Sequence, residues 1–229
     1  MHGTESAGGP LRIAIVGAES TGKSVLAHAL DEALAREFGL RCAVVDEYLR
    51  EWCDREGRTP RREEQRGIAL EHARRIDAAA AQPGLDVLLC DTTPLMVAVY
   101  SDLLFNDRSV EAVALACHRR MDISLLTSLD LPWVADGLQR EGPHVQAPVD
   151  ARVRARLNDW ETTWSVVSGS GAVRTAAAVD ALRPLLRERL ASPGRGASCP
   201  ADGLERPRLR WHCELCDDPI FERLLPNGK

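Results

Sequence analysis

A glycine-rich segment with a single lysine is the part of the sequence best suited to chemistry. Residues 17–24 read GAESTGKS, which matches the phosphate-binding pattern G-x-x-x-x-G-K-S/T. The glycines let backbone N–H groups turn toward phosphate oxygens, and the start of the next helix adds partial positive charge. In such loops the lysine reaches the β- and γ-phosphates and the last hydroxyl ligates Mg²⁺. The residues expected to hold ATP are Gly17, Ala18, Glu19, Ser20, Thr21, Gly22, Lys23 and Ser24, with Lys23 also catalytic.

Carboxylates follow two later apolar runs and could complete this site. Asp91 comes directly after VLLC, the place of a Walker B aspartate, and is expected to serve Mg²⁺ together with Ser24. A turn that caps the next helix is the other interpretation of Asp91, and the two are compatible. Asp46 and Glu47 follow CAVV, where a carboxylate could accept the proton of an acceptor hydroxyl or simply be solvated. Which of Asp46, Glu47 and Asp91 acts as general base stays open.

The lysine count supports a chemical role for the loop. Of the 29 basic residues only two are lysines, Lys23 and Lys229. We attribute the low lysine count to a coding bias that favours arginine. Lys23 is retained despite this bias because a compact ammonium fits between phosphates and a guanidinium does not.

Net charge and hydropathy exclude some classes of partner. The formal charge of −5 and a pI near 5.7 argue against nucleic acid, because duplex-binding proteins usually carry a basic face. The chain has no apolar run of 18 residues and no signal-peptide pattern, so we expect no membrane partner and a cytoplasmic location. The expected partners are a nucleotide and a small-molecule acceptor, and the oligomeric state is not predicted.

Alternating apolar runs and helical patterns predict the elements that position these residues. The expected strands are 11–16, 42–45, 86–91, 123–126 and 164–167. The expected helices are 23–38, 60–81 with Thr59 as its N-cap, 109–121, 150–163 with Asp150 as its cap, and 177–191. Strands joined through helices form parallel sheets with helices on both faces, which bind ligands beyond the carboxyl ends of their strands. The predicted fold class is therefore α/β, a P-loop NTPase or kinase fold with a five-stranded parallel sheet and a small C-terminal appendage.

Composition divides the chain into four parts. We expect a flexible N-terminus over 1–10, the P-loop kinase domain over 11–191, a linker rich in Pro, Gly, Ser and Arg over 192–207, and a cysteine-containing tail over 208–229.

The tail contains a C-x-x-C pair, the spacing with which two thiolates meet one zinc ion. A structural zinc site would use Cys199, His212, Cys213 and Cys216; the alternatives are a redox pair or an incidental tail. The other cysteines, Cys42, Cys53, Cys90 and Cys117, lie mostly in apolar runs and are expected in the core.

Four motifs, taken in order, resemble the ribosylnicotinamide kinase domain of the bacterial NAD-biosynthesis regulator NadR. They are the loop 17–24, Glu47-Tyr48 with Arg50-Glu51, Asp91-Thr92-Thr93 with Tyr100, and Asp130-x-Pro132-Trp133-x-x-Asp136-Gly137-x-x-Arg140. The resemblance spans about residues 11–190. It implies a P-loop kinase that transfers the γ-phosphate of ATP to the 5′-hydroxyl of nicotinamide riboside in NAD salvage.

The resemblance also implies roles for individual residues. The acceptor side would be formed by Asp46, Glu47, Arg50, Trp133, Asp136 and Arg140. Trp133 could stack on a pyridinium ring or fill the core, and Arg140 could clamp phosphate. Arg119 and Arg120 could do the same, but a solvated helix face suits them better. Only about ten residues precede the first expected strand, so we expect neither the DNA-binding nor the nucleotidyltransferase domain of the multi-domain regulators.

Other functions remain open at this stage. One is a P-loop regulator that binds and slowly hydrolyses ATP, and another is a kinase of a different nucleoside or small alcohol. The sequence does not choose between ATP and GTP, although residues 169–171 could contact adenine.

Overall fold

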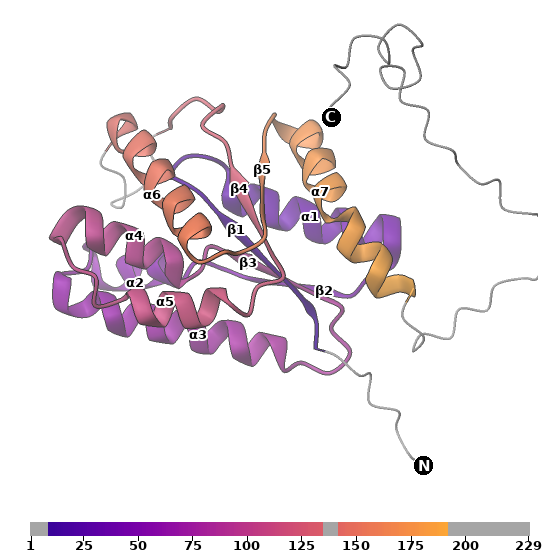
Figure 1. Ribbon diagram of the computed structural model, residues 1–229, viewed down its shortest axis with the longest axis horizontal. Coiled ribbons are helices and arrows are strands. Elements are labelled where there is room, and N and C mark those ends of the chain that lie inside the picture. The colour runs from indigo at the N-terminus through magenta and orange to yellow at the C-terminus, as the bar shows by residue number, and fades with distance from the viewer. Residues whose placement is uncertain (1–8, 135–141, 192–229) are drawn as a thin grey trace, which may run out of the picture. The chain divides into compact units, whose positions relative to one another are not determined.

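A five-stranded parallel sheet with helices on both faces forms the centre of the described domain (Figure 1). The computed structural model describes residues 9–134 and 142–191. The strands are β1 (Leu11–Val16), β2 (Cys42–Val45), β3 (Val87–Asp91), β4 (Ile123–Thr127) and β5 (Trp164–Val167), in the spatial order β2-β3-β1-β4-β5. The α-helices are α1 (Lys23–Phe38), α2 (Tyr48–Glu56), α3 (Gln65–Ala80), α4 (Pro94–Phe105), α5 (Glu111–His118), α6 (Gln146–Asp159) and α7 (Gly171–Ala191). The predicted fold class of the domain is confirmed; the predicted appendage lies outside the described residues.

The central strand β1 shows why both faces of the sheet need a cover. Successive side chains of a strand point to opposite faces. Ile13 and Ile15 are fully buried in a cluster with α1 and α7, whereas Ala14 and Val16 are fully buried in a cluster with α4 and α6. Figure 1 shows α1 and α7 on one side of the sheet and α3, α4, α5 and α6 on the other. Burial on both faces explains why the strands are continuous apolar runs in the sequence.

Two helices, α2 and α4, were not predicted from the sequence. In α2, the buried side chains are Tyr48, Trp52 and Cys53, which have helical spacing. They lie in a polar stretch of the sequence that is too short to show a clear helical period. In α4, most side chains are buried, so the helix has no polar face and its amphipathic signal is missing. Thr93 begins α4 by accepting a hydrogen bond from Leu95 N–H at 3.3 Å.

Two predicted helix caps are wrong. The helix expected to begin after Thr59 begins at Gln65, preceded by the 3₁₀ turn Arg62–Glu64. The Glu64 carboxylate accepts the Arg61 N–H at 2.7 Å and therefore fixes the later start.

Asp150 lies inside α6, which begins at Gln146. Its carboxylate pairs with Arg154 one turn later, at 2.7 Å, and caps nothing. The last helix also starts earlier than expected, at Gly171.

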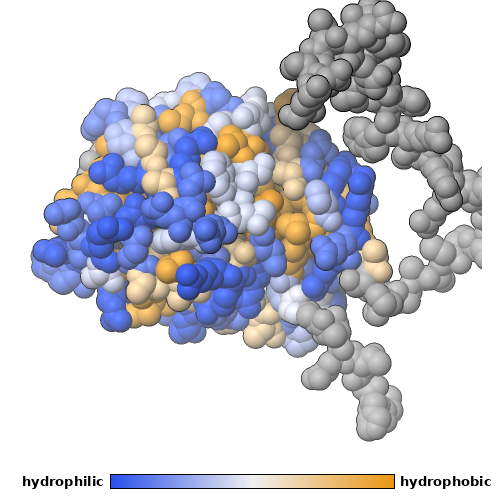
Figure 2. Space-filling model, viewed as in Figure 1, coloured by the Kyte–Doolittle hydropathy of each residue, from blue (hydrophilic) through white to orange (hydrophobic). Residues whose placement is uncertain are grey.

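Most cysteines of the described ranges lie in the core, and the visible surface of the domain is largely polar. The face seen in Figure 2 is hydrophilic over most of its area, with hydrophobic residues in small groups. None of the helices in the described ranges is long and apolar enough to cross a membrane. The cysteines of those ranges form no disulfide, and Cys53, Cys90 and Cys117 are buried as predicted. Cys42 is half-buried, and burial followed by the charge of Asp31 raises the pKa of its thiol to about 12.

Candidate active site

The glycine-rich loop leaves β1 and turns tightly into α1. Gly17 has a φ of 146°, and a Cβ on it would lie 2.2 Å from Thr127 Oγ1 on β4, so only glycine fits there. Gly22, with a φ of 74°, is the left-handed residue that precedes α1. The Thr21 hydroxyl lies 2.7 Å from the Ala18 carbonyl and 2.7 Å from the Thr127 hydroxyl, and so fixes the loop internally and to β4. The fold thus gives residues 17–24 the compact turn that the motif predicts.

Lys23, Ser24 and Asp91 meet where the loop enters α1. The pairing of β1 with β3 sets Asp91 opposite Ile15, just before the loop begins. The Lys23 ammonium donates to the Ala18 carbonyl at 2.8 Å and so lies over the loop. Burial raises the pKa of Asp91, which is 3% exposed, although a hydrogen bond with Ser24 and the charge of Lys23 oppose this rise. These three side chains lie together at one end of the candidate site.

This end of the site fits a magnesium ion. Mg²⁺ prefers oxygen ligands and is usually held by one or two carboxylates together with substrate phosphates. Ser24 and Asp91 offer a hydroxyl and a carboxylate, and the buried Asp91 Oδ1 has no hydrogen-bond partner. Among the described residues there is no cluster of three or more His, Cys, Asp or Glu side chains that could hold a metal, so water and phosphate oxygens would supply the further ligands.

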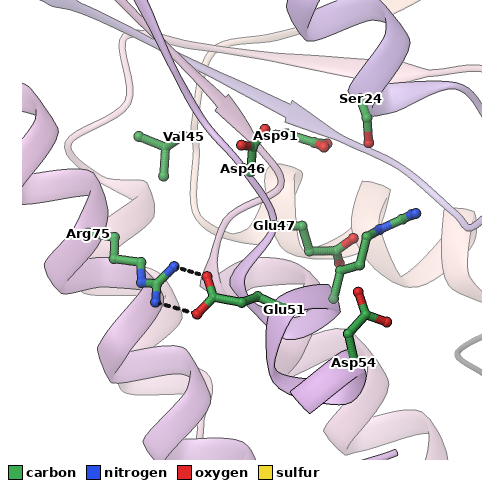
Figure 3. Close-up of a pocket in the computed structure, with 9 residues that line it drawn as sticks. Ser24, Val45, Asp46, Glu47, Glu51, Asp54, Arg75 and Asp91 are labelled. Atoms are coloured by element: carbon green, nitrogen blue, oxygen red, sulfur yellow. Dashed lines mark hydrogen bonds and ion pairs between the residues drawn. The ribbon is translucent and has the colours of Figure 1, made fainter. Parts of the chain in front are cut away.

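A cavity of about 530 Å³ adjoins this end and extends along α2. It is lined by Ser24, Val45, Asp46, Glu47, Arg50, Glu51, Asp54, Arg75 and Asp91. Figure 3 shows Ser24 and Asp91 on one side of the cavity and Arg75 on the other. The lining holds five carboxylates and two guanidinium groups, a formal charge of −3. A cavity of this size and charge suits a small, polar, uncharged or cationic molecule.

The far wall of the cavity is a fixed ion pair. Arg75 on α3 donates both terminal nitrogens to Glu51 on α2, which lowers the pKa of the Glu51 carboxyl (Figure 3). The same guanidinium lies 4.2 Å from the ring centre of Tyr48 and donates its Nε to Glu71 at 3.0 Å. Sequence reasoning missed Arg75. The i,i+4 spacing of Glu71 and Arg75 predicts an ion pair between these two residues. It does not predict the pair of Arg75 with Glu51, because Glu51 lies on α2, a helix that was not predicted.

The predicted acceptor residues of the β2–α2 segment do line one cavity. Glu47 is half-buried and precedes α2. The Asp46 side chain is 78% exposed and lies 3.6 Å from His28 Nε2. Arg50 is exposed at the rim. Of these groups, Glu47 combines a place in the lining with partial burial, which suits it best to receive a proton from a bound hydroxyl.

Trp133 lies away from the cavity lining and contacts the phosphate loop instead. Its Nε1 donates to Glu19 Oε1 at 3.5 Å, and the Gly142 N–H donates to the same oxygen at 3.3 Å. The next residue, Val134, donates its N–H to Ser20 Oγ at 2.7 Å. The side chains of Glu19 and Ser20, both expected at the nucleotide, are thus engaged with the segments that flank residues 135–141.

Several predicted residues fall outside the described ranges. They are Asp136 and Arg140 of the acceptor set and Cys199, His212, Cys213 and Cys216 of the zinc hypothesis. Arg119 and Arg120 are exposed at the end of α5, as expected for a solvated helix face, and Arg120 pairs with Asp77 at 3.1 Å.

Comparison with known proteins identifies the fold and its relatives. A family model described as "AAA domain" matches residues 12–174. No curated protein sequence matches the chain. Two crystal structures of NadR protein, in complex with NAD and AMP-PNP and in complex with NR, match with TM-scores of 0.59 and 0.62, each at 17% identity over 76% of this chain. They are covered over 49% and 50% of their own length, so this chain spans about half of each.

A thymidylate kinase from Ehrlichia chaffeensis also matches, with a TM-score of 0.54 and 13% identity, over 78% of this chain and 100% of the other. The predicted NadR resemblance is therefore supported at the level of fold, which is that of the P-loop kinases. None of these matches supports a zinc site.

Proposed function

We propose that this chain, which belongs to the AAA domain family, is an ATP-dependent kinase that phosphorylates the 5′-hydroxyl of nicotinamide riboside. The observation that carries the proposal is the acidic cavity, which opens beside Ser24 and Asp91 at the phosphate loop. The NadR structures support it, because a protein that shares this fold over about half of its length was crystallised with AMP-PNP and with NR.

The phosphate loop provides the nucleotide half of the reaction. Backbone N–H groups of residues 17–24 and the start of α1 bind the phosphates, and the Lys23 ammonium moves from the Ala18 carbonyl to the β- and γ-phosphate oxygens. Mg²⁺ held by Ser24 and Asp91 would neutralise charge on the same phosphates. Because the transition state of phosphoryl transfer is loose, positioning and charge stabilisation by these residues dominate the catalysis.

The cavity provides the acceptor half. A hydroxyl that enters it beside Asp91 meets the half-buried Glu47 carboxylate. Glu47 accepts the hydroxyl proton as the oxygen bonds to the γ-phosphorus, while the bond from that phosphorus to the β,γ-bridging oxygen breaks and ADP leaves. The Glu51–Arg75 pair forms the opposite wall. The remaining charged groups of the lining, which set the local charge, are Asp46, Glu47, Arg50, Asp54 and Asp91.

The negative charge of the cavity lining distinguishes between the candidate acceptor molecules. A nucleoside monophosphate, the acceptor class of a thymidylate kinase, would bring about two negative charges among these carboxylates. The pyridinium ring of nicotinamide riboside is a cation and is attracted by them. The cavity therefore favours the riboside over a nucleotide acceptor on the same fold.

An acceptor panel with matched charges tests the proposal. Nicotinamide riboside and its dihydro form have nearly the same shape, but only the former is cationic. We expect nicotinamide riboside to be phosphorylated with a kcat/KM roughly tenfold above that of the dihydro form, and thymidine monophosphate not to react. ADP release in a coupled assay measures all three. ADP release that no riboside stimulates would refute the kinase assignment and favour an ATPase regulator, and equal rates with the two forms would refute the charge argument.

Replacing Glu47 with glutamine should lower kcat by roughly 10²-fold with little change in the KM for ATP. The loss is at the low end for a general base because a loose transition state needs little help from proton transfer. Glu56→Gln, on the exposed end of the same helix, is the control and should behave as wild type. An E47Q enzyme that retains its kcat would assign the proton to another acceptor.

A further inference from the structure

Arg174 is a buried arginine that joins three segments around the phosphate loop. It is 4% exposed and lies in the first turn of α7. Its Nε donates to the Gly169 carbonyl at 2.7 Å, and one terminal nitrogen donates to the Thr21 carbonyl inside the loop. The other terminal nitrogen pairs with Asp130 and lies 3.5 Å from Ser128 Oγ, both just beyond β4. One side chain thus connects the phosphate loop, the end of β4 and the β5–α7 loop.

The local network satisfies the buried charge. A buried guanidinium is tolerated when it is paired and its donors are used, and the planar fork of arginine can serve several acceptors at once. Asp130 also accepts the Gly169 N–H at 2.6 Å, so β4 and the β5–α7 loop are tied twice. Burial alone would raise the pKa of Asp130, but hydrogen bonds from Ser128 and Gly169 and the charge of Arg174 together lower it.

The contact with Thr21 lies directly before a left-handed residue of the loop. Thr21 precedes Gly22, which is left-handed, and a Cβ on Gly22 would lie 3.5 Å from Arg174 Nη1. The carbonyl of Thr21 is therefore held at the step where the loop enters α1. Because Arg174 is 4% exposed and directs Nε and both terminal nitrogens at protein oxygens, we argue that it acts on phosphate through the loop rather than by direct contact.

We propose that Arg174 is a positioning residue that sets the phosphate loop relative to the β5–α7 loop and thereby fixes the affinity for the nucleotide. The inference rests on the nucleotide-binding half of the proposed function and is independent of which acceptor is used. Lysine cannot replace it, because a single ammonium on a flexible stem cannot hold the carbonyls of Thr21 and Gly169 and the Asp130 carboxylate in their separate directions.

The test compares Arg174→Lys with a matched variant of a second buried arginine. Arg156 is 6% exposed and pairs with Asp102 at 2.9 Å and Glu111 at 3.2 Å, joining α4, α5 and α6 rather than the loop. We expect R174K to weaken binding of Mg·ATP by roughly tenfold in calorimetry and to raise the KM for ATP equally, with the acceptor KM unchanged. We expect R156K to lower the melting temperature and to leave ATP affinity at the wild-type value.

The outcomes separate this inference from the proposed function. If wild type binds no Mg·ATP, both the proposed function and the inference are wrong. If wild type binds ATP and R174K binds it equally well, only the inference is wrong, and Arg174 is purely structural. Should R174K not fold, Asp130→Asn keeps Arg174 and removes its charged partner; a lower ATP affinity supports the inference and an unchanged one overturns it.

Discussion

Replacing Lys23 with alanine should lower kcat/KM for ATP by roughly 10³-fold or more while the domain stays folded. The ammonium lies over the loop with the Ala18 carbonyl as a partner and is the group that the motif directs to the transferring phosphate. Removing it deletes a positive charge from the place where negative charge develops in the transition state. Steady-state kinetics with the riboside, together with thermal unfolding of both proteins, measures the effect.

Two further variants make this result interpretable. Lys23→Arg keeps the charge but replaces a compact ammonium by a planar fork, and we expect it to remain strongly impaired. Arg36→Ala removes a cation from the exposed last turn of α1 and should retain wild-type rates. If K23A kept most of its activity, the phosphate-loop assignment itself would be wrong, whereas an active K23R would mean that only charge matters at this position.

The sequence was sufficient for the parts of the site that belong to one segment. The loop 17–24 is contiguous, so its motif predicts its own geometry, and the structure gives it the expected turn. Asp91 was placed correctly because parallel strands end at one edge of a sheet, and β3 pairs directly with β1. Both predictions needed only local patterns and one rule of topology.

The missed residues depend on partners far away in the sequence. Arg75 reaches Glu51 across 24 positions, and Arg174 reaches Thr21 across 153. Both are among the many arginines of a chain with only two lysines, so residue type does not distinguish them. For Trp133 the sequence left stacking on the acceptor and packing in the core open, and it did not indicate the contact of the indole N–H with Glu19. These side chains are positioned by tertiary packing, which no spacing along the chain encodes.

The missed helices have a related cause. Helix α4 is apolar on nearly all sides because α3, α5 and α6 contact it, so the periodicity that reveals a surface helix is absent. Its start matters for the site, since Thr93 caps it only two residues after Asp91. A helix that supports the catalytic edge is therefore the one that sequence periodicity is least able to detect.

Asp91 combines a chemical role with a cost to stability, and this gives the second large prediction. Asp91→Asn should lower kcat by roughly 10³-fold, because the site loses the carboxylate that serves Mg²⁺. The same change should raise the melting temperature of the ligand-free protein at neutral pH, since a buried carboxylate with an unpartnered Oδ1 is replaced by a neutral amide. Activity assays and thermal unfolding of this one variant should therefore show a lower kcat and a higher melting temperature.

The pH dependence of the Asp91→Asn effect distinguishes this explanation from a general repacking of the core. Burial raises the pKa of Asp91 in the folded state above its ordinary value of 3.8, so the folded protein holds the proton more tightly than the unfolded chain. The wild type therefore loses stability relative to D91N as pH rises from the unfolded to the folded pKa, and the gain from the substitution is complete only above that window. Well below pH 3.8 Asp91 is protonated in both the folded and the unfolded wild type, and the gain should vanish. The control is Asp86, a buried aspartate that precedes the other end of β3 and accepts the Arg41 N–H at 2.8 Å. Asp86→Asn should keep its activity and show no such gain. A D91N protein that is less stable than wild type at neutral pH would mean that the Asp91 carboxylate is held for structure rather than for the metal.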